Sequence, residues 1–194
     1  MRLDEKKKTA APAFFMIIIL TLCFLLFSCV SFAGKKQLYA YLTDRARYVL
    51  LPHGEIEKPM DSFQIITASF AGQDYYFNAW VRADKDGMYM SLFNELGASM
   101  GDLSYRDGDI YFSSRVFPKE LNPEYIVADF QLCFYNPQSL GRALGKCGLN
   151  LEVQSSNRRI LSGKNLITEI EKTHNTVKLI NHLRGYSYTL AGEF

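Results

Sequence analysis

The chain has 194 residues, of which 48% are hydrophobic, and it carries 22 basic and 20 acidic side chains. This length is enough for one domain with a substantial core. The near balance of charge excludes the basic surface that a nucleic-acid-binding domain needs, so we expect no nucleic acid among its partners.

The N-terminus is typical of a secretory signal. Charged residues between Arg2 and Lys8 are followed by an uninterrupted apolar run from Phe14 to Phe27. This run is shorter than the ~20 residues that a membrane-spanning helix needs. Small residues follow it directly, as they do at a cleavage site. We therefore expect residues 1–28 to be a signal peptide.

Two cleavage sites compete at the end of the apolar run. Leu26 to Cys29 resembles the lipobox of bacterial lipoproteins, in which the cysteine receives a diacylglycerol and becomes the new N-terminus. Phe27 is bulkier than the residue usual at its position. The rival is Ser31 to Ala33, a small-x-small site for ordinary signal peptidase. We favour lipid attachment at Cys29 because this cysteine ends the apolar run.

The lipobox resemblance also implies a location. Val30 follows the cysteine, and it is not the aspartate that typically retains lipoproteins at the inner membrane. We therefore expect a lipid-anchored protein at the periplasmic face of the outer membrane. Cleavage at Cys29 removes four basic and two acidic residues and leaves 18 of each, a neutral mature chain.

Cys133 and Cys147 would be the unmodified cysteines of the mature chain. An oxidising periplasm permits a disulfide between them. Alternatively, Cys133 lies on the apolar stripe of a predicted helix and behaves as a small buried hydrophobe. The sequence leaves both possibilities open.

The mature chain divides into a lead-in and a domain. Residues 29–60 are polar, contain Pro52 and Pro59, and are interpreted as a lipidated N-terminus, tether and lead-in. The domain spans 61–194 and opens with five segments of strand length, at 62–70, 75–82, 88–93, 99–106 and 109–117. Their connections are short, and Asp86-Gly87 and Asp107-Gly108 are strong hairpin signals. This pattern predicts an antiparallel meander.

Helical spacing replaces the strand pattern after Asn122. Asn122 can cap a helix, Pro123 suits its first turn, and Ile126 and Phe130 continue its apolar stripe. A shorter helix is expected after Pro137. Five further strand-like segments follow, at 149–154, 158–163, 166–173, 176–183 and 186–190. The fold class is therefore mainly β: a single curved antiparallel sheet, or incomplete barrel, with a helical lid inserted between two strand groups.

The early strands share one apolar face, which defines a candidate cavity beneath the helix. Side chains two residues apart point to the same face of a strand. The predicted cavity residues are Tyr75, Phe77, Ala79, Val81, Met88, Met90, Leu103, Ile126 and Phe130. Such a face either closes as a solid core or leaves room for an apolar ligand.

This order of elements resembles LolA and LolB, the periplasmic lipoprotein carriers whose incomplete antiparallel barrel is lidded by helices and holds acyl chains. LolB has a protruding loop with an exposed leucine before a glycine, and Glu95-Leu96-Gly97 occupies the corresponding place here. Residues 122–132 and 177–190 are still more similar to an uncharacterised LolB-like lipoprotein family often encoded with aryl-polyene pigment genes. Members commonly have proline where this chain has Glu95.

The resemblance implies a function. We expect an outer-membrane lipoprotein that binds an acylated passenger, either a lipoprotein or an aryl-polyene lipid, and assists its delivery, with Leu96 contacting membrane or passenger. The alternative for Leu96 is that its side chain folds back onto its own domain. A LolA-like periplasmic carrier is the implied partner. The alternative is a non-catalytic, lipid-anchored accessory subunit of an outer-membrane assembly.

No enzymatic chemistry is expected. His53, His174 and His182 are scattered, and no hydrolase, zinc-binding or phosphate-binding motif occurs. We therefore expect no cofactor, metal or catalytic residue. DKDG at 84–87 is interpreted as a hairpin turn, Arg158 and Arg159 as a solvated strand end, and Asp129 and Gln131 as polar residues that fix the helix to the sheet.

Overall fold

The computed structural model describes residues 37–115, 117 and 121–194. The predicted signal peptide, Cys29 and the rival cleavage site at 31–33 lie outside the described residues. None of the described helices has the length and apolarity needed to cross a membrane.

Ten strands form one antiparallel sheet, in the spatial order β7-β6-β5-β4-β3-β12-β11-β10-β9-β8. The first group is β3 (Met60–Phe70), β4 (Gln73–Asp84), β5 (Gly87–Phe93), β6 (Ser99–Arg106) and β7 (Asp109–Ser114). The second group is β8 (Asn150–Gln154), β9 (Asn157–Ser162), β10 (Asn165–Lys172), β11 (Thr176–Asn181) and β12 (Tyr186–Gly192). Antiparallel pairing of β12 with β3 joins the two groups. In the described part of the chain β7 and β8 do not pair, so the sheet stays open.

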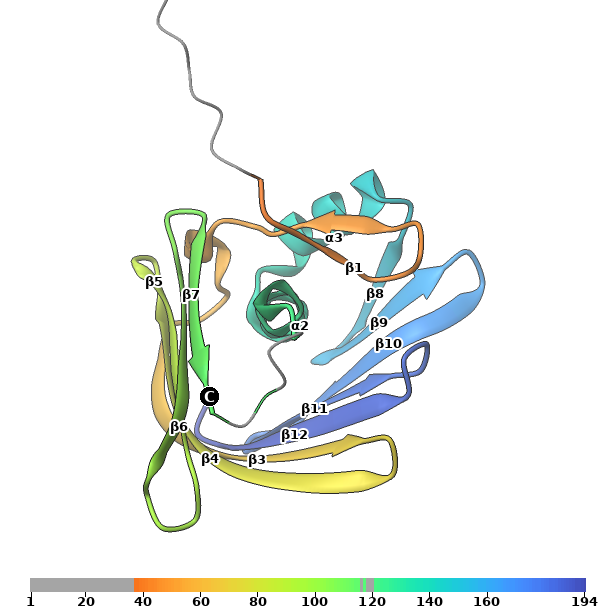
Figure 1. The fold of residues 1–194 in the computed structure, drawn as a ribbon. Helices are drawn as coiled ribbons and strands as arrows, with labels where there is room; N and C mark the ends of the chain where they lie inside the picture. Colours follow the sequence, from red (N-terminus) through yellow and green to blue (C-terminus); the bar gives the residue numbers. More distant parts are fainter. Residues whose placement is uncertain (1–36, 116, 118–120) are drawn as a thin grey trace, which may run out of the picture. The chain divides into compact units, whose positions relative to one another are not determined.

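Two helices lie between the strand groups in the sequence, α2 (Pro123–Phe134) and α3 (Pro137–Lys146). Asn122 caps α2 by accepting a hydrogen bond from the Glu124 amide, and Asn136 caps α3 in the same way. Figure 1 shows the sheet curving around α2, which lies inside the concave face. The mainly β class, one large open antiparallel sheet and the inserted helices are thus confirmed, and a separate two-stranded sheet in residues 39–49 was not predicted.

The strand faces follow the alternation in the sequence. The register pairs Gln64 with Ala79 and Ile66 with Phe77, so these residues share the inner face. Val81 pairs with Met90, and Met90 with Leu103, which extends the same face across β5 and β6. The predicted turn at 84–87 is also confirmed, because the Asp84 carboxylate accepts hydrogen bonds from the amides of Asp86 and Gly87.

The folded unit begins upstream of the boundary predicted at residue 61. Residues 38–59 contribute β1 (Tyr39–Tyr41), β2 (Arg47–Val49) and the short 3-10 helix η1 (His53–Glu55). Several of their side chains belong to the main core, namely Ala40, Leu42, Ala46, Tyr48 and Leu50. The apolar residues here are spaced among charges and prolines, so their pattern does not predict that they join the core. The segment packs over α2 and α3 (Figure 1).

Candidate functional site

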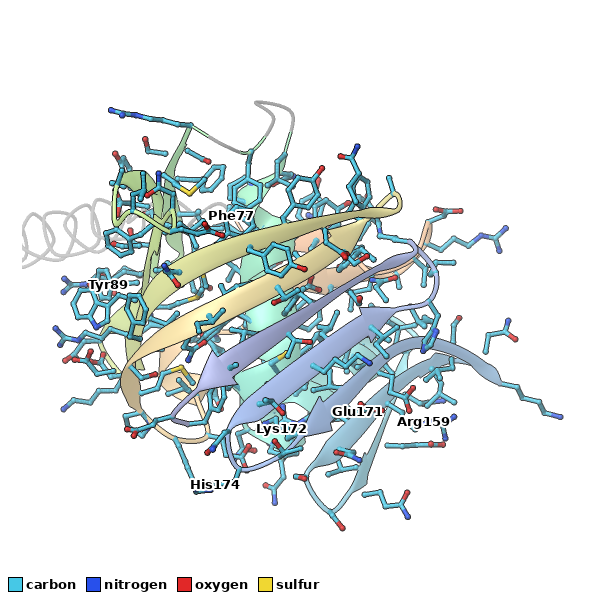
Figure 2. The ribbon with its side chains drawn as sticks, turned by 90° about the horizontal axis from the view of Figure 1, so that it is seen from below. Phe77, Tyr89, Arg159, Glu171, Lys172 and His174 are labelled. Carbon is cyan, nitrogen blue, oxygen red and sulfur yellow. The ribbon has the colours of Figure 1, made fainter. Side chains whose placement is uncertain are left out.

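The predicted cavity residues lie together on the inner side of the sheet. Six strand residues, Phe77, Ala79, Val81, Met88, Met90 and Leu103, are buried in the same core as Phe130 of α2. Ile126 is partly buried against this core. Tyr75 is the exception, because its side chain, near the N-terminal end of β4, is exposed. Figure 2 shows the position of Phe77 on this half of the sheet. Most of the predicted lining is therefore packed against the central helix.

One end of the inner face is less tightly covered. The register sets Tyr188, Ala68 and Tyr75 in one row across β12, β3 and β4. Ala68 and Tyr188 are partly exposed, as are Ile66, two residues before Ala68 on the same face of β3, and Ile126 of α2. Phe70, at the end of β3, is exposed. We call this region, defined by Ile66, Ala68, Phe70, Tyr75, Ile126, Tyr186 and Tyr188, the open end of the inner face.

Aromatic rings line one side of the open end. The rings of Tyr75 and Phe77 stack with centroids 6.4 Å apart. Phe117 lies 5.9 Å from Phe77 and 6.2 Å from Phe112, again between ring centroids. Offset and tilted pairs of this kind contribute about 1 kcal/mol each beyond the burial of their area. The rings of Tyr75, Phe77, Phe112 and Phe117 therefore form a packed apolar surface at one side of the open end.

A buried carboxylate marks the other side. Asp129 of α2 accepts a hydrogen bond from the Tyr186 hydroxyl at 2.7 Å, and Asn181 donates to that hydroxyl at 3.3 Å. Burial raises the pKa of Asp129 to about 7, although Tyr186 and Arg184 both oppose this shift. The prediction that Asp129 fixes the helix to the sheet is confirmed, because Tyr186 belongs to β12.

The Tyr188 side chain is surrounded by protein atoms, yet part of its surface remains accessible to solvent. Burial among protein atoms raises the pKa of its hydroxyl well above the ordinary value of 10. Its side chain nevertheless keeps part of its surface exposed. Tyr186 and Tyr188 were both missed as site residues. The alternation in YSYTL places them on one face, but only the pairing of β12 with β3 brings that face beside Ala68.

Leu96 lies at the tip of the hairpin between β5 and β6. It is 93% exposed, so it does not fold back onto its own domain. The Asn94 side chain accepts hydrogen bonds from the amides of Leu96 and Ala98, at 3.0 and 2.8 Å. Gly97 has φ 78°, a left-handed conformation that favours glycine. The turn is thus fixed by its polar residues, and the leucine side chain is left to solvent.

Arg158 was wrongly predicted to be solvated. It is 2% exposed, and its guanidinium bonds to the Glu57 carboxylate at 2.7 Å and to the Leu132 carbonyl at 2.8 Å. Leu132 lies in the last turn of α2, where carbonyls lack helical partners. Arg158 therefore binds the C-terminal end of α2. Arg159 is exposed, as expected.

Cys133 and Cys147 are both free thiols, and Cys133 is buried. Among the described residues, no three His, Cys, Asp or Glu side chains form a group that could hold a metal ion. At the open end the Tyr186 hydroxyl is bonded to Asp129 and the Tyr75 hydroxyl donates to the Gln73 side chain. What this end offers is therefore an apolar surface with one buried carboxyl beside it.

The fold and site define an open antiparallel sheet curved around a central helix, with an apolar inner face that is partly uncovered at one end. Residues 61–191 match the family described as "Protein of unknown function (DUF3261)", and the chain belongs to this family. No curated protein matches the sequence.

Proposed function

We propose that this protein binds an acyl-bearing molecule against the inner face of its sheet and helps to deliver it to the outer membrane. The observation that carries the proposal is the open end, where apolar side chains that face the central helix keep part of their surface exposed. A hydrocarbon tail would gain about 0.8 kcal/mol for each methylene group that it buries there.

The apolar surface at the open end is continuous with the core. Ile66 pairs with Leu190 on one side and with Phe77 on the other, and both of these neighbours are buried. A chain entering over Ala68 would therefore meet apolar atoms along its path toward α2. Tyr188, enclosed by protein but still partly exposed, lies in the same row as Ala68.

The exposed Leu96 side chain can contact a membrane or the lipid of a passenger during transfer. Burying one leucine side chain in a membrane or against a lipid gains roughly 2 kcal/mol. The hairpin is held by Asn94, so Leu96 can be buried without rearranging the sheet. Movement of a passenger between successive apolar sites follows their relative affinities, so this process requires no cofactor.

The resemblance to LolB-like lipoproteins supports the remaining features of the proposal. It implies that Cys29 carries a lipid, that the protein lies at the periplasmic face of the outer membrane, and that a LolA-like carrier is its partner. The passenger is a lipoprotein or an aryl-polyene lipid. Glu95 replaces the proline that is common at this turn in the resembling family. The role of Leu96 in transfer therefore needs an experiment of its own.

Filling the open end tests lipid binding. The protein is purified from its native envelope, and bound lipid is measured by extraction and native mass spectrometry. We expect Ala68→Phe to lose most of the bound lipid because its ring occupies the row between Tyr75 and Tyr188. Thr67→Phe is the matched control, since the neighbouring residue points to the opposite face. An absence of acyl chains in the wild type, or equal retention by Ala68→Phe, would refute lipid binding here.

Delivery is tested separately with Leu96→Glu. We expect this variant to keep its bound lipid and to lose transfer of labelled lipid into liposomes. Glu95→Gln on the same turn is the control and should transfer at the wild-type rate. If Leu96→Glu transfers normally, Leu96 has no part in delivery, and the binding proposal stands on the first experiment alone.

A second candidate is a non-catalytic accessory subunit of an outer-membrane assembly. The observation that favours it is the burial of six of the predicted cavity residues against α2, as in a filled core. Under this alternative the purified protein carries no lipid, and it co-purifies in stoichiometric amount with an outer-membrane partner.

A further inference from the structure

A shallow groove of about 400 Å³ lies on the outer face of the sheet, opposite the central helix. It crosses β4, β5, β6 and β7. Its principal side chains are Trp80, Arg82, Ser91, Asp102, Ser104 and Tyr111. Figure 2 looks onto the sheet from below, with Tyr89 of β5, also a lining residue, at one side and Arg159 of β9 at the other. The groove therefore lies on the first strand group, and β3 separates it from β12 of the second group.

Two aromatic side chains form the ends of the groove. Trp80 on β4 is 43% exposed and Tyr111 on β7 is 64% exposed. Three strand spacings separate β4 from β7, which corresponds to roughly 14 Å. The serines Ser91 and Ser104 occupy the strands between them. Because serine is small, the floor is low at Ser91 and Ser104, whereas the partly buried Tyr89 of β5 lies beside Ser104.

The groove carries both hydrogen-bond donors and hydrogen-bond acceptors. The Ser91 hydroxyl donates to the Asp102 carboxylate at 2.7 Å. Arg82 forms an ion pair with Asp84 at 3.2 Å. A carboxylate accepts several hydrogen bonds and a guanidinium donates up to five, so both can also bond to a ligand. Arg82 and Asp84 neutralise each other and Asp102 adds one negative charge, so the groove does not attract an anion, whereas the hydroxyl groups of a neutral polar ligand can donate to the Asp102 carboxylate.

We propose that this groove binds a neutral oligosaccharide. A pyranose ring has an apolar face of C–H groups, which stacks on aromatic rings, and a rim of hydroxyls, which both donate and accept hydrogen bonds. The groove offers these two features side by side, with exposed rings at its ends, Ser91 and Asp102 between them, and Arg82 beside Trp80 on β4. Its length and volume match two or three sugar rings. Proline-rich peptides also bind aromatic grooves, but they offer few donors for the Asp102 carboxylate.

The single tryptophan of the chain is Trp80, so its fluorescence reports directly on the groove. The full-length protein is kept in a detergent without a sugar headgroup and titrated with cellotriose, maltotriose and chitotriose. We expect a saturable change of Trp80 emission with at least one of these sugars. Calorimetry of the same titration gives the affinity independently of the fluorophore.

Variants locate the binding. Tyr111→Ala and Ser91→Phe should each weaken the affinity at least about tenfold, the first by removing a stacking ring and the second by filling the floor. Tyr76→Ala is the matched control, because Tyr76 is exposed on the same face of β4 but does not line the groove. It should bind as the wild type does, and circular dichroism verifies that each variant is folded.

Three results would overturn the inference: no response to any of the three sugars, a response that Tyr111→Ala and Ser91→Phe leave unchanged, or competition for the site by a proline-rich peptide with higher affinity than the sugars. The groove lies on the face opposite the open end, so these results do not affect the proposal of lipid binding.

Discussion

The side-chain amide of Gln131 forms two hydrogen bonds with the main chain of Leu51. Its oxygen accepts from the Leu51 amide at 2.9 Å, and its nitrogen donates to the Leu51 carbonyl at 2.8 Å. The same oxygen accepts from the Tyr48 hydroxyl at 2.9 Å. Gln131 belongs to α2, and Leu51 follows β2. These bonds therefore fasten the N-terminal segment to the central helix.

Replacing Gln131 with leucine tests the importance of this junction. The change leaves the Tyr48 hydroxyl and the Leu51 amide without their partner, whereas the Leu51 carbonyl keeps a hydrogen bond from the Tyr105 hydroxyl, so we expect the free energy of unfolding to fall by roughly 2–4 kcal/mol. Urea denaturation followed by circular dichroism measures it. Gln138→Leu, at an exposed site on α3, should change the value by less than ~0.5 kcal/mol. Equal losses in the two variants would contradict this assignment.

The strand order within each group and the inner face of the early strands could be predicted from the sequence. Alternation in residues 75–82 determines that Phe77, Ala79 and Val81 share a face, because successive side chains of a strand point to opposite sides. Short turns such as Asp86-Gly87 then require neighbouring strands to pair. Both features depend on residues that are close in the sequence, so the pattern of neighbouring residues predicts them.

The remaining site features depend on contacts between distant parts of the chain. Asp129 meets Tyr186 only because α2 lies inside the curved sheet. Arg158 is buried because Glu57, from the segment predicted to be a tether, reaches its guanidinium. The spacing of residues along the sequence predicts neither the Asp129–Tyr186 contact nor the Arg158–Glu57 contact. For Leu96 the sequence left burial and exposure nearly equal, because one leucine in a turn has no pattern around it.

Asp129 makes stability depend on pH. Its pKa is raised to about 7 in the folded protein, mainly by burial, and is near 3.9 in the unfolded chain. Between these values the folded state binds more protons, so the free energy of unfolding falls as pH rises from about 4 to 7. Asp129→Asn should make this fall shallower. Urea midpoints at a series of pH values measure the slope.

Tyr186→Phe provides the complementary test of the same carboxyl. The hydroxyl of Tyr186 lowers the pKa of Asp129, so its removal should move the loss of stability to higher pH. An unchanged slope in Asp129→Asn, or a shift to lower pH in Tyr186→Phe, would show that another group controls the pH dependence.

Two glycines are expected to respond oppositely to alanine. A Cβ at Gly101 of β6 would lie 2.5 Å from the Ser113 carbonyl oxygen, a backbone atom that cannot move freely. We expect Gly101→Ala to destabilise the protein by about 1–3 kcal/mol. A Cβ at Gly145 of α3 meets no atom within 4 Å, and alanine favours the helix, so Gly145→Ala should stabilise by up to ~1 kcal/mol. Denaturation midpoints of both variants measure the contrast, and a loss in Gly145→Ala would contradict it.

The two thiols of the domain should react at very different rates. Burial raises the pKa of Cys133 to about 12, whereas Cys147 is only half-buried and its thiol contacts the Leu144 carbonyl at 3.1 Å. Because the thiolate is the reactive form, we expect iodoacetamide at pH 8 to modify Cys147 in the folded protein and Cys133 only after unfolding. Peptide mass spectrometry without reductant resolves the two sites. A peptide that links Cys133 to Cys147 would contradict the free thiols of this fold and would show that the C-terminal end of α3 can approach the interior of α2.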